Sequence, residues 1–290
     1  NLVYYWIYEF FLLIQIVFAL FCSTNVFLHS PRLLLYNLYY KSIMLIGNFI
    51  IALLLSSVFM DHIHKNWQLL RERIAQAAAR AGRDPAAIEV VAVSKTRGAS
   101  EVEAAYECGL RIAGENRIQE ATAKRPLVAA SFSWHMIGHL QTNKAGQAVE
   151  CFDVVQSVDS GRLARALDRR AEQAGRVLEV LLQVNTSGSE AQSGVEPGEL
   201  TDLVMAVAPL ANLQVRGLMT IGAHSDDEAV VRGCFRKLRE LSEEIGAGSG
   251  DSGVLMDYLS MGMSGDFELA IEEGANLLRL GTAIFGSRPT

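Results

Sequence analysis

The sequence has few cysteines, no excess of basic residues and no cluster of metal-ligating side chains. Its four cysteines, Cys22, Cys108, Cys151 and Cys234, lie far apart and form no CxxC pair. This spacing argues against a disulfide framework or a zinc site and is typical of a reducing compartment. The net charge of −6 and the pI of about 5.6 exclude the basic surface that nucleic-acid binding requires. We therefore expect a cytoplasmic protein that binds neither metal nor nucleic acid.

Charge is also nearly missing from residues 1–59, which contain one acid, two bases and one glycine. Residues 60–290 instead contain 24 basic and 31 acidic residues and are rich in Ala, Gly, Arg and Glu. Two apolar stretches, 10–21 and 43–59, suggest a membrane hairpin, and the second is just long enough to span a bilayer. A translated upstream region outside the natural protein explains the same break, since AT-rich codons encode the residues that dominate before Met60. We divide the chain into a hydrophobic extension, 1–59, and a domain, 60–290.

Residues 60–290 alternate between helical and extended patterns after a first helix predicted over 66–81. Strands are predicted at 88–94, 111–114, 133–137, 154–158, 178–184, 213–221, 258–261 and 277–285. Helices are predicted between them at 100–108, 117–124, 142–149, 160–174, 197–208, 226–245 and 266–273. Strict alternation of this kind predicts parallel strands and, with eight units, a (β/α)8 barrel with an additional N-terminal helix. A doubly wound open sheet is the alternative, but no glycine-rich phosphate turn follows the first strand.

The first strand is an apolar run that ends on Lys95. One interpretation is that the chain leaves the core there and the amine reaches water. The other is that the amine points into a cleft and forms a Schiff base. Alternation along the strand puts Val91, Val93 and Lys95 on one face. In a barrel the residues that follow each strand meet at one mouth, where we also expect Glu115 and Asn116.

Two glycine-containing stretches near the end of the domain predict a phosphate site. "SMGMSGD" covers 260–266 and leads into a helix, and "RLGTAIFG" covers 279–286 with Gly281-Thr282 in a turn. The loops after the seventh and eighth strands of such barrels commonly bind phosphate through backbone N–H groups. Either loop alone is explained by a simple turn. Together, opposite an inward lysine, they favour a phosphate-bearing aldehyde, pyridoxal phosphate.

From Met60 onward the chain resembles the pyridoxal phosphate homeostasis proteins, relatives of the barrel domain of alanine racemase. The motifs that carry the resemblance are "AVSKT" (92–96), "GENRIQE" (114–120), "WHMIGHLQTNK" (134–144), "SVDS" (157–160), "RGLMTIGA" (216–223), "SMGMSGDFELAI" (260–271) and "LRLGTAIFGSR" (278–288). The resemblance implies that Lys95 is the Schiff-base lysine and that Arg279 faces the pyridine nitrogen. It implies that Ser264, Gly281 and Thr282 form the phosphate cradle, with Ser260 nearby. It also implies that Asn116 lies at the edge of the cofactor.

One stretch departs from the family pattern, because Gln192 stands in a loop where relatives usually carry a lysine. We expect a weaker secondary anion contact there and an unchanged main site. Racemisation needs a second base opposite Lys95. Tyr106, Tyr258, His135 and His139 are the candidates, but each reads more simply as a packing or hydrogen-bonding residue, and the chain ends soon after Gly281. A monomeric carrier that buffers pyridoxal phosphate or delivers it to apoenzymes is therefore favoured, and a racemase or related enzyme is the alternative. Membrane contact is expected only if residues 1–59 are genuine.

Overall fold

The computed structural model describes Lys41, Gly47 and residues 61–248 and 253–287. The chain divides into two compact units, Asn1–Leu55 and Ser56–Thr290. The expected membrane hairpin falls, apart from Lys41 and Gly47, outside the described residues. Within the described part, every helix is too short or too polar to cross a bilayer. The second unit contains all the named strands and helices from β1 (Glu89–Val93) to α10 (Thr282–Phe285).

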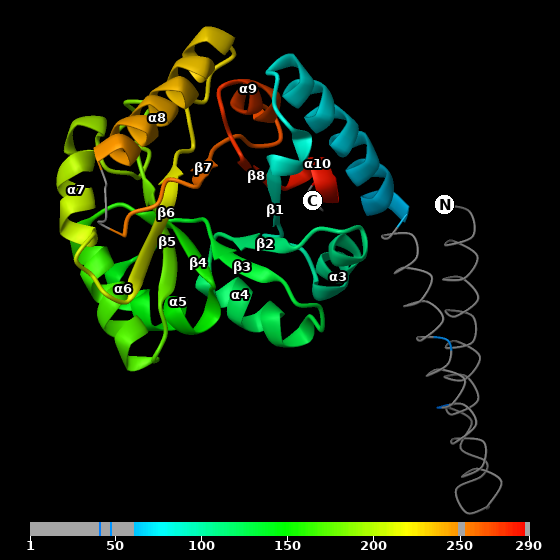
Figure 1. The fold of residues 1–290 in the computed structure, drawn as a ribbon. Coiled ribbons are helices and arrows are strands. Elements are labelled where there is room, and N and C mark those ends of the chain that lie inside the picture. Colours follow the sequence, from blue (N-terminus) through cyan, green and yellow to red (C-terminus); the bar gives the residue numbers. More distant parts are fainter. Residues whose placement is uncertain (1–40, 42–46, 48–60, 249–252, 288–290) are drawn as a thin grey trace, which may run out of the picture. The chain divides into compact units, whose positions relative to one another are not determined.

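Eight parallel strands form a closed barrel in the order β1 to β8, with β1 pairing β8 (Figure 1). Closure excludes the doubly wound open sheet and confirms the (β/α)8 architecture. The strands are β1 (Glu89–Val93), β2 (Ile112–Glu115), β3 (Ser133–Met136), β4 (Val154–Val158), β5 (Leu178–Gln183), β6 (Leu213–Met219), β7 (Tyr258–Ser260) and β8 (Leu277–Leu280).

Helices surround the barrel and connect its strands (Figure 1). Residues 61–80 form a helix before β1, which confirms the predicted helix over 66–81 and extends it at its start, with Leu70, Ile74 and Ala78 buried and Trp67 half-buried. The others are α3 (Ala99–Glu107), α4 (Ile118–Lys124), α5 (Ala145–Cys151), α6 (Gly161–Gln173), α7 (Leu200–Val207), α8 (Glu228–Gly248), α9 (Phe267–Glu272) and α10 (Thr282–Phe285). Short 3-10 turns precede β1, α5 and α7 and follow α4.

The last predicted strand, 277–285, is wrong beyond Leu280. The chain leaves β8 at Gly281 and forms the one-turn helix α10. A short apolar run such as Ala283–Phe285 fits a strand or a buried helix equally well by pattern. The turn places Gly281 and Thr282 at the start of a helix, where backbone N–H groups lack helical partners.

The strands bury both faces, which accounts for their nearly continuous apolar sequences. One apolar cluster fills the barrel interior and consists of Val91, Ile112, Leu181, Met219 and Leu277. The other faces of the strands pack against the helices in a larger cluster that includes Ala92, Ala113 and Leu278. Because side chains alternate along a strand, these two clusters define which residues point inward.

Candidate active site

Lys95 stands in the turn that follows β1, at the end where parallel strands of a barrel expose their carboxyl termini. Its side chain is half-buried. The next residue, Thr96, has φ of 64°, a conformation that is rare for a β-branched residue. Its backbone N–H donates to Glu120 Oε2 over 3.0 Å. Strained backbone conformations are often found at functional sites. Here the hydrogen bond to Glu120 holds the strained backbone beside Lys95.

Arg279 lies on the inward face of β8 and is 5% exposed. Its two terminal nitrogens donate to Ser260 Oγ and to the Thr220 carbonyl, both over 2.7 Å. Burial lowers the pKa of the guanidinium to about 10, so it remains a cation at neutral pH. Within the described ranges no carboxylate forms an ion pair with it, although Asp266 favours the charged form from a distance. The barrel therefore contains a fixed positive charge.

A chain of buried hydrogen bonds continues from Arg279 across the barrel. Ser260 Oγ donates to Gln156 Oε1 over 2.6 Å, and Gln156 Nε2 lies 2.7 Å from His135 Nδ1. His135 Nε2 lies 3.1 Å from Ser133 Oγ. The chain joins strands β8, β7, β4 and β3, which are distant in sequence.

The direction of each bond in this chain follows from its ends. Arg279 can only donate, so the Ser260 oxygen accepts from it and its proton goes to Gln156. The Gln156 amide nitrogen then faces His135, whose Nδ1 must accept, which leaves the ring proton on Nε2. Burial lowers the pKa of His135 to about 3, in agreement with a neutral ring. The orientation of Arg279 is thereby set by a continuous, directional network.

The two glycine loops meet at the end of β7 and β8. Ser264 Oγ accepts a hydrogen bond from the Ala283 N–H over 3.2 Å, which ties the loop after β7 to the start of α10. A Cβ added at Gly281 would lie 3.3 Å from the Val93 carbonyl oxygen, so the turn runs close to the end of β1. Thr282 is exposed. The structure thus brings together the predicted cradle residues Ser264, Gly281 and Thr282.

Asn116 follows β2 and is half-buried. A Cβ on Gly138, after β3, would lie 2.3 Å from the Asn116 carbonyl oxygen, so only glycine permits this close approach. The contact fixes the backbone of Asn116 at the rim of the barrel.

Comparison with known proteins gives the family. The model of the alanine racemase N-terminal domain matches residues 60–289. A pyridoxal phosphate homeostasis protein of Pseudomonas aeruginosa is 43% identical over 230 residues, which are 79% of this chain and 97% of that protein. This chain belongs to the pyridoxal phosphate homeostasis protein family.

Two solved structures of similar sequence share the fold. An unknown protein from Bifidobacterium adolescentis is 40% identical, with a TM-score of 0.75 over 78% of this chain and 96% of that one. PipY of Synechococcus elongatus, solved with pyridoxal phosphate bound, is 38% identical, with a TM-score of 0.65 over 73% of this chain and all of that one. The family resemblance stated from the motifs is confirmed.

Glu115 does not face the mouth, contrary to expectation. It points outward from β2, is fully buried and pairs with Lys124 of α4. Lys124 Nζ also donates to the Ser94 carbonyl over 2.7 Å, and Ser94 Oγ donates to Glu115 Oε1 over 2.6 Å. Burial raises the pKa of Glu115, and its Oε2 has no hydrogen-bond partner. Alternation gives the reason: Ile112 and Gly114 point inward, so Glu115 points outward.

Gln156 and Lys124 are two members of these networks that the sequence did not single out. Gln156 is a polar residue within the buried strand VVQSV, and that position was an available signal. Lys124 is 8% exposed at the end of α4, where lysine is common on the surface, so it carried no signal.

Three of the four candidates for a second base lie away from the barrel mouth or are fully hydrogen-bonded. Tyr258 is the first residue of β7, and its hydroxyl donates to Glu89 at the start of β1, at the opposite end of the barrel. Tyr106 packs edge-on against Phe132 outside the barrel. His135 is buried and neutral. His139 alone is exposed at the rim, with Nδ1 3.5 Å from Asp159 Oδ2.

Cys108, Cys151 and Cys234 are free thiols, and burial is the main cause that raises the pKa of the first two. No group of His, Cys, Asp and Glu side chains suitable for a metal occurs in the part of the chain that the structure describes.

Proposed function

We propose that this protein binds pyridoxal phosphate at the mouth of its barrel, with Lys95 as the Schiff-base lysine, and that it buffers or delivers the cofactor. The observation that carries the proposal is the relative solved with pyridoxal phosphate bound, which this chain matches over the whole length of that relative. The motifs around Lys95, Asn116, Ser264, Arg279, Gly281 and Thr282 support it.

The residues at the mouth fit such a ligand. The ligand has an aldehyde, a pyridine nitrogen and a dianionic phosphate, and the site offers an amine, a buried cation and a loop of backbone N–H groups beside a hydroxyl. Arg279 faces the pyridine nitrogen, and Ser264, Gly281 and Thr282 hold the phosphate. Asn116 contacts the edge of the ring. Ser260 acts through Arg279, because its oxygen accepts from Arg279 and its proton goes to Gln156.

The arginine also restricts the chemistry of the site. Bound pyridoxal phosphate supplies an electron sink, which is strongest when its pyridine nitrogen is protonated. Arg279 can only donate hydrogen bonds and keeps its proton at neutral pH, so it holds that nitrogen unprotonated. The sink is weakened, which favours storage of the cofactor over catalysis.

A carrier is favoured over a racemase for a second reason. Racemisation requires proton transfer on both faces of the bound substrate. Of the four candidates for the second base, only His139 is exposed at the rim. Its Nδ1 lies 3.5 Å from Asp159 Oδ2 and 3.4 Å from Ser193 Oγ. The recipient apoenzymes, a monomeric state and a cytoplasmic location stay predictions.

The proposal is tested by borohydride reduction of the protein incubated with pyridoxal phosphate, followed by peptide mapping. We expect one reduced adduct, on Lys95, and a yellow colour that Lys95→Ala abolishes. The matched control Lys237→Ala, on the exposed face of α8, should retain both. An adduct on another lysine of the unmodified protein would overturn the assignment, and enzymatic inversion of alanine would overturn the carrier function.

A further inference from the structure

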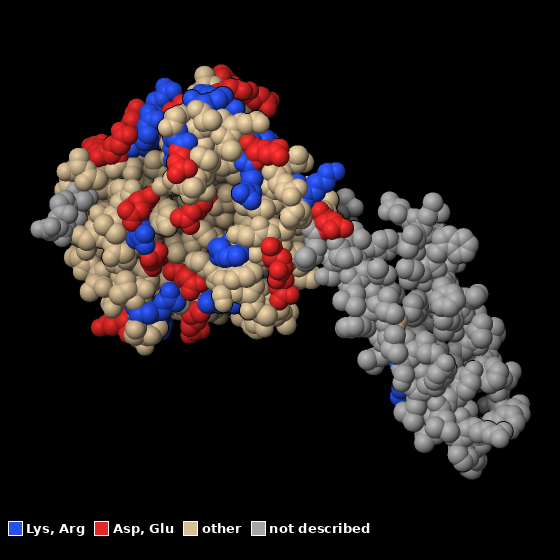
Figure 2. Space-filling view, turned by 45° about the vertical axis from the view of Figure 1, so that its right-hand side comes forward, with Lys and Arg blue, Asp and Glu red and all other residues tan. Residues whose placement is uncertain are grey.

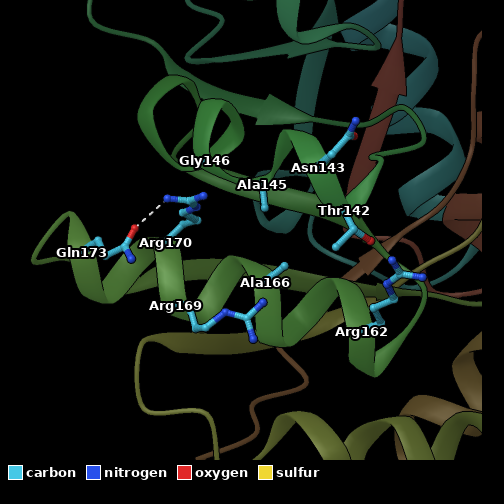
Figure 3. A pocket seen from close by; sticks show the side chains of 9 residues that line it. All are labelled: Thr142, Asn143, Ala145, Gly146, Arg162, Ala166, Arg169, Arg170 and Gln173. Carbon is cyan, nitrogen blue, oxygen red and sulfur yellow. Dashed lines mark hydrogen bonds between the residues drawn. The ribbon is translucent and has the colours of Figure 1, made fainter.

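A hollow of about 330 Å³ lies between α5 and α6, away from the barrel interior (Figure 3). Its floor consists of the small residues Ala145, Gly146 and Ala166. Gly146 gives room to Arg170, whose Nε lies 3.5 Å from where a Cβ would be. A floor without bulky side chains allows a peptide backbone or a carboxylate to approach closely.

The rim of the hollow is basic. Three of its nine lining residues, Arg162, Arg169 and Arg170, are arginines, and none is acidic. All three are exposed. Arg170 donates to Gln173 over 2.8 Å, and none of the three forms an ion pair with an acid of the described chain. The nearby acid Asp168 is engaged elsewhere, because its Oδ1 accepts from the backbone and side chain of Asn212.

Eight arginines elsewhere on the described chain form ion pairs with acids. Arg216 pairs with Glu179 and Asp257, and Arg232 pairs with Glu272. On the face shown in Figure 2, basic and acidic side chains are interspersed in this way. Single arginines such as Arg83 also form no ion pair within the described chain, but at the hollow three such arginines lie together, so this surface is locally positive in a chain of net charge −6.

The spacing of the arginines selects the kind of occupant. Arg162 and Arg169 are seven residues apart on one helix, which is about 10 Å along its axis. Figure 3 shows Arg162 beside Thr142 at one end and Arg170 beside Gly146 at the other. A single phosphate group cannot reach both ends, whereas an extended acidic peptide rises about 3.3 Å per residue and so covers this distance in roughly three to four residues. The lining contains no aromatic residue for base stacking, which disfavours single-stranded nucleic acid.

The hollow continues toward the barrel rim. A second hollow shares Thr142, Asn143 and Arg162 with it and includes His139 and Asp159, which follow β3 and β4. A ligand lying along α6 would thus reach the carboxyl-terminal side of the barrel. We propose that the α5–α6 hollow is the docking site for an acidic segment of a partner protein. This inference does not rest on the cofactor proposal, since none of its residues belongs to the candidate cofactor site.

The experiment measures fluorescence anisotropy of a labelled octaglutamate peptide mixed with the full chain at low salt. We expect binding that weakens as salt rises, because exposed charges are screened. The triple variant Arg162→Glu/Arg169→Glu/Arg170→Glu should bind the peptide at least about tenfold more weakly. The matched control Arg165→Glu removes an exposed arginine of the same helix that does not line the hollow, and it should weaken binding about threefold at most.

Thermal melting and pyridoxal phosphate titration of each variant verify that the fold and the cofactor site are intact. Equal binding of the peptide by the unmodified protein and the triple variant would overturn the proposal. The proposal would also be overturned if inorganic phosphate, added at constant ionic strength, displaced the peptide completely. The same holds if an oligonucleotide bound the hollow more tightly than the peptide.

Discussion

The barrel wall separates two buried cations whose surroundings are opposite. Outside the wall, Lys124 pairs with the fully buried Glu115, so the cluster is close to neutral. Inside, Arg279 is held by a hydroxyl and a carbonyl and is compensated by no carboxylate in contact among the described residues. This difference in surroundings indicates that Lys124 has a structural role and that Arg279 is available for binding. A compensated pair holds α4 against the end of β1, whereas the uncompensated cation is the one that we propose to face the pyridine nitrogen of the ligand.

The largest effect on stability is expected from breaking the compensated pair. Lys124→Met leaves the Glu115 carboxylate buried without a cation, which costs about 3–5 kcal/mol in the free energy of unfolding. Urea denaturation at neutral pH measures it. The double variant Glu115→Gln/Lys124→Met should regain most of the loss, since neither charge remains. A double variant as unstable as the single one would show that packing, not charge, is responsible.

The same variant has a pH signature with a defined sign. Burial already raises the pKa of Glu115 above its ordinary value, and loss of Lys124 raises it further. A carboxyl group with a raised pKa in the folded state stabilises the fold at low pH and loses that contribution as the pH rises through the raised pKa. The deficit of Lys124→Met relative to the unmodified protein should therefore be greatest at neutral pH and shrink on acidification.

Removal of the uncompensated cation should act mainly on binding. Arg279→Met loses two hydrogen bonds but also removes a desolvated charge, so we expect a loss of about 1–3 kcal/mol in stability without cofactor. Affinity for pyridoxal phosphate, measured by equilibrium dialysis, should fall at least about tenfold, or about 1.4 kcal/mol. Arg83→Met is the matched control, because Arg83, like Arg279, donates two hydrogen bonds, in its case to the carbonyls of Ile271 and Ala275. That control should lose stability and retain affinity; unchanged affinity in Arg279→Met would instead refute the role of the cation.

Much of this comparison was not accessible from the sequence. The strict alternation of apolar runs predicted the barrel, and strand ends predicted Lys95 and the glycine loops as neighbours. The hydrophobic pattern predicted a strand over 281–285, but this short apolar run forms a helical turn. It also could not pair Ser260 with Gln156, which are 104 residues apart and meet only when the barrel closes. Alternation of side chains within β2 was sufficient to predict that Glu115 points outward. The sequence carried no signal for its partner Lys124, because lysine at a helix end is usually exposed.

The smallest expected effect distinguishes the two serines near the proposed phosphate cradle. Ser264 Oγ accepts from the Ala283 N–H, which leaves its own proton available for the proposed phosphate, whereas the proton of Ser260 goes to Gln156. We expect Ser264→Ala to lower affinity for pyridoxal phosphate by about 1–2 kcal/mol, as for a hydrogen bond to a charged group, and to leave affinity for pyridoxal unchanged.

Ser260→Ala should instead lower both affinities by the same factor, because it frees Arg279 to reorient and removes no phosphate contact. The ratio of the two affinities, from parallel titrations of each variant, is the measurement. It is insensitive to general destabilisation, which affects both ligands equally. A Ser260→Ala protein that loses affinity for pyridoxal phosphate alone would mean that this hydroxyl contacts the phosphate directly. The hydrogen bonds of Gln156 would then run the other way: its amide nitrogen would donate to Ser260, and its carbonyl oxygen would accept from His135.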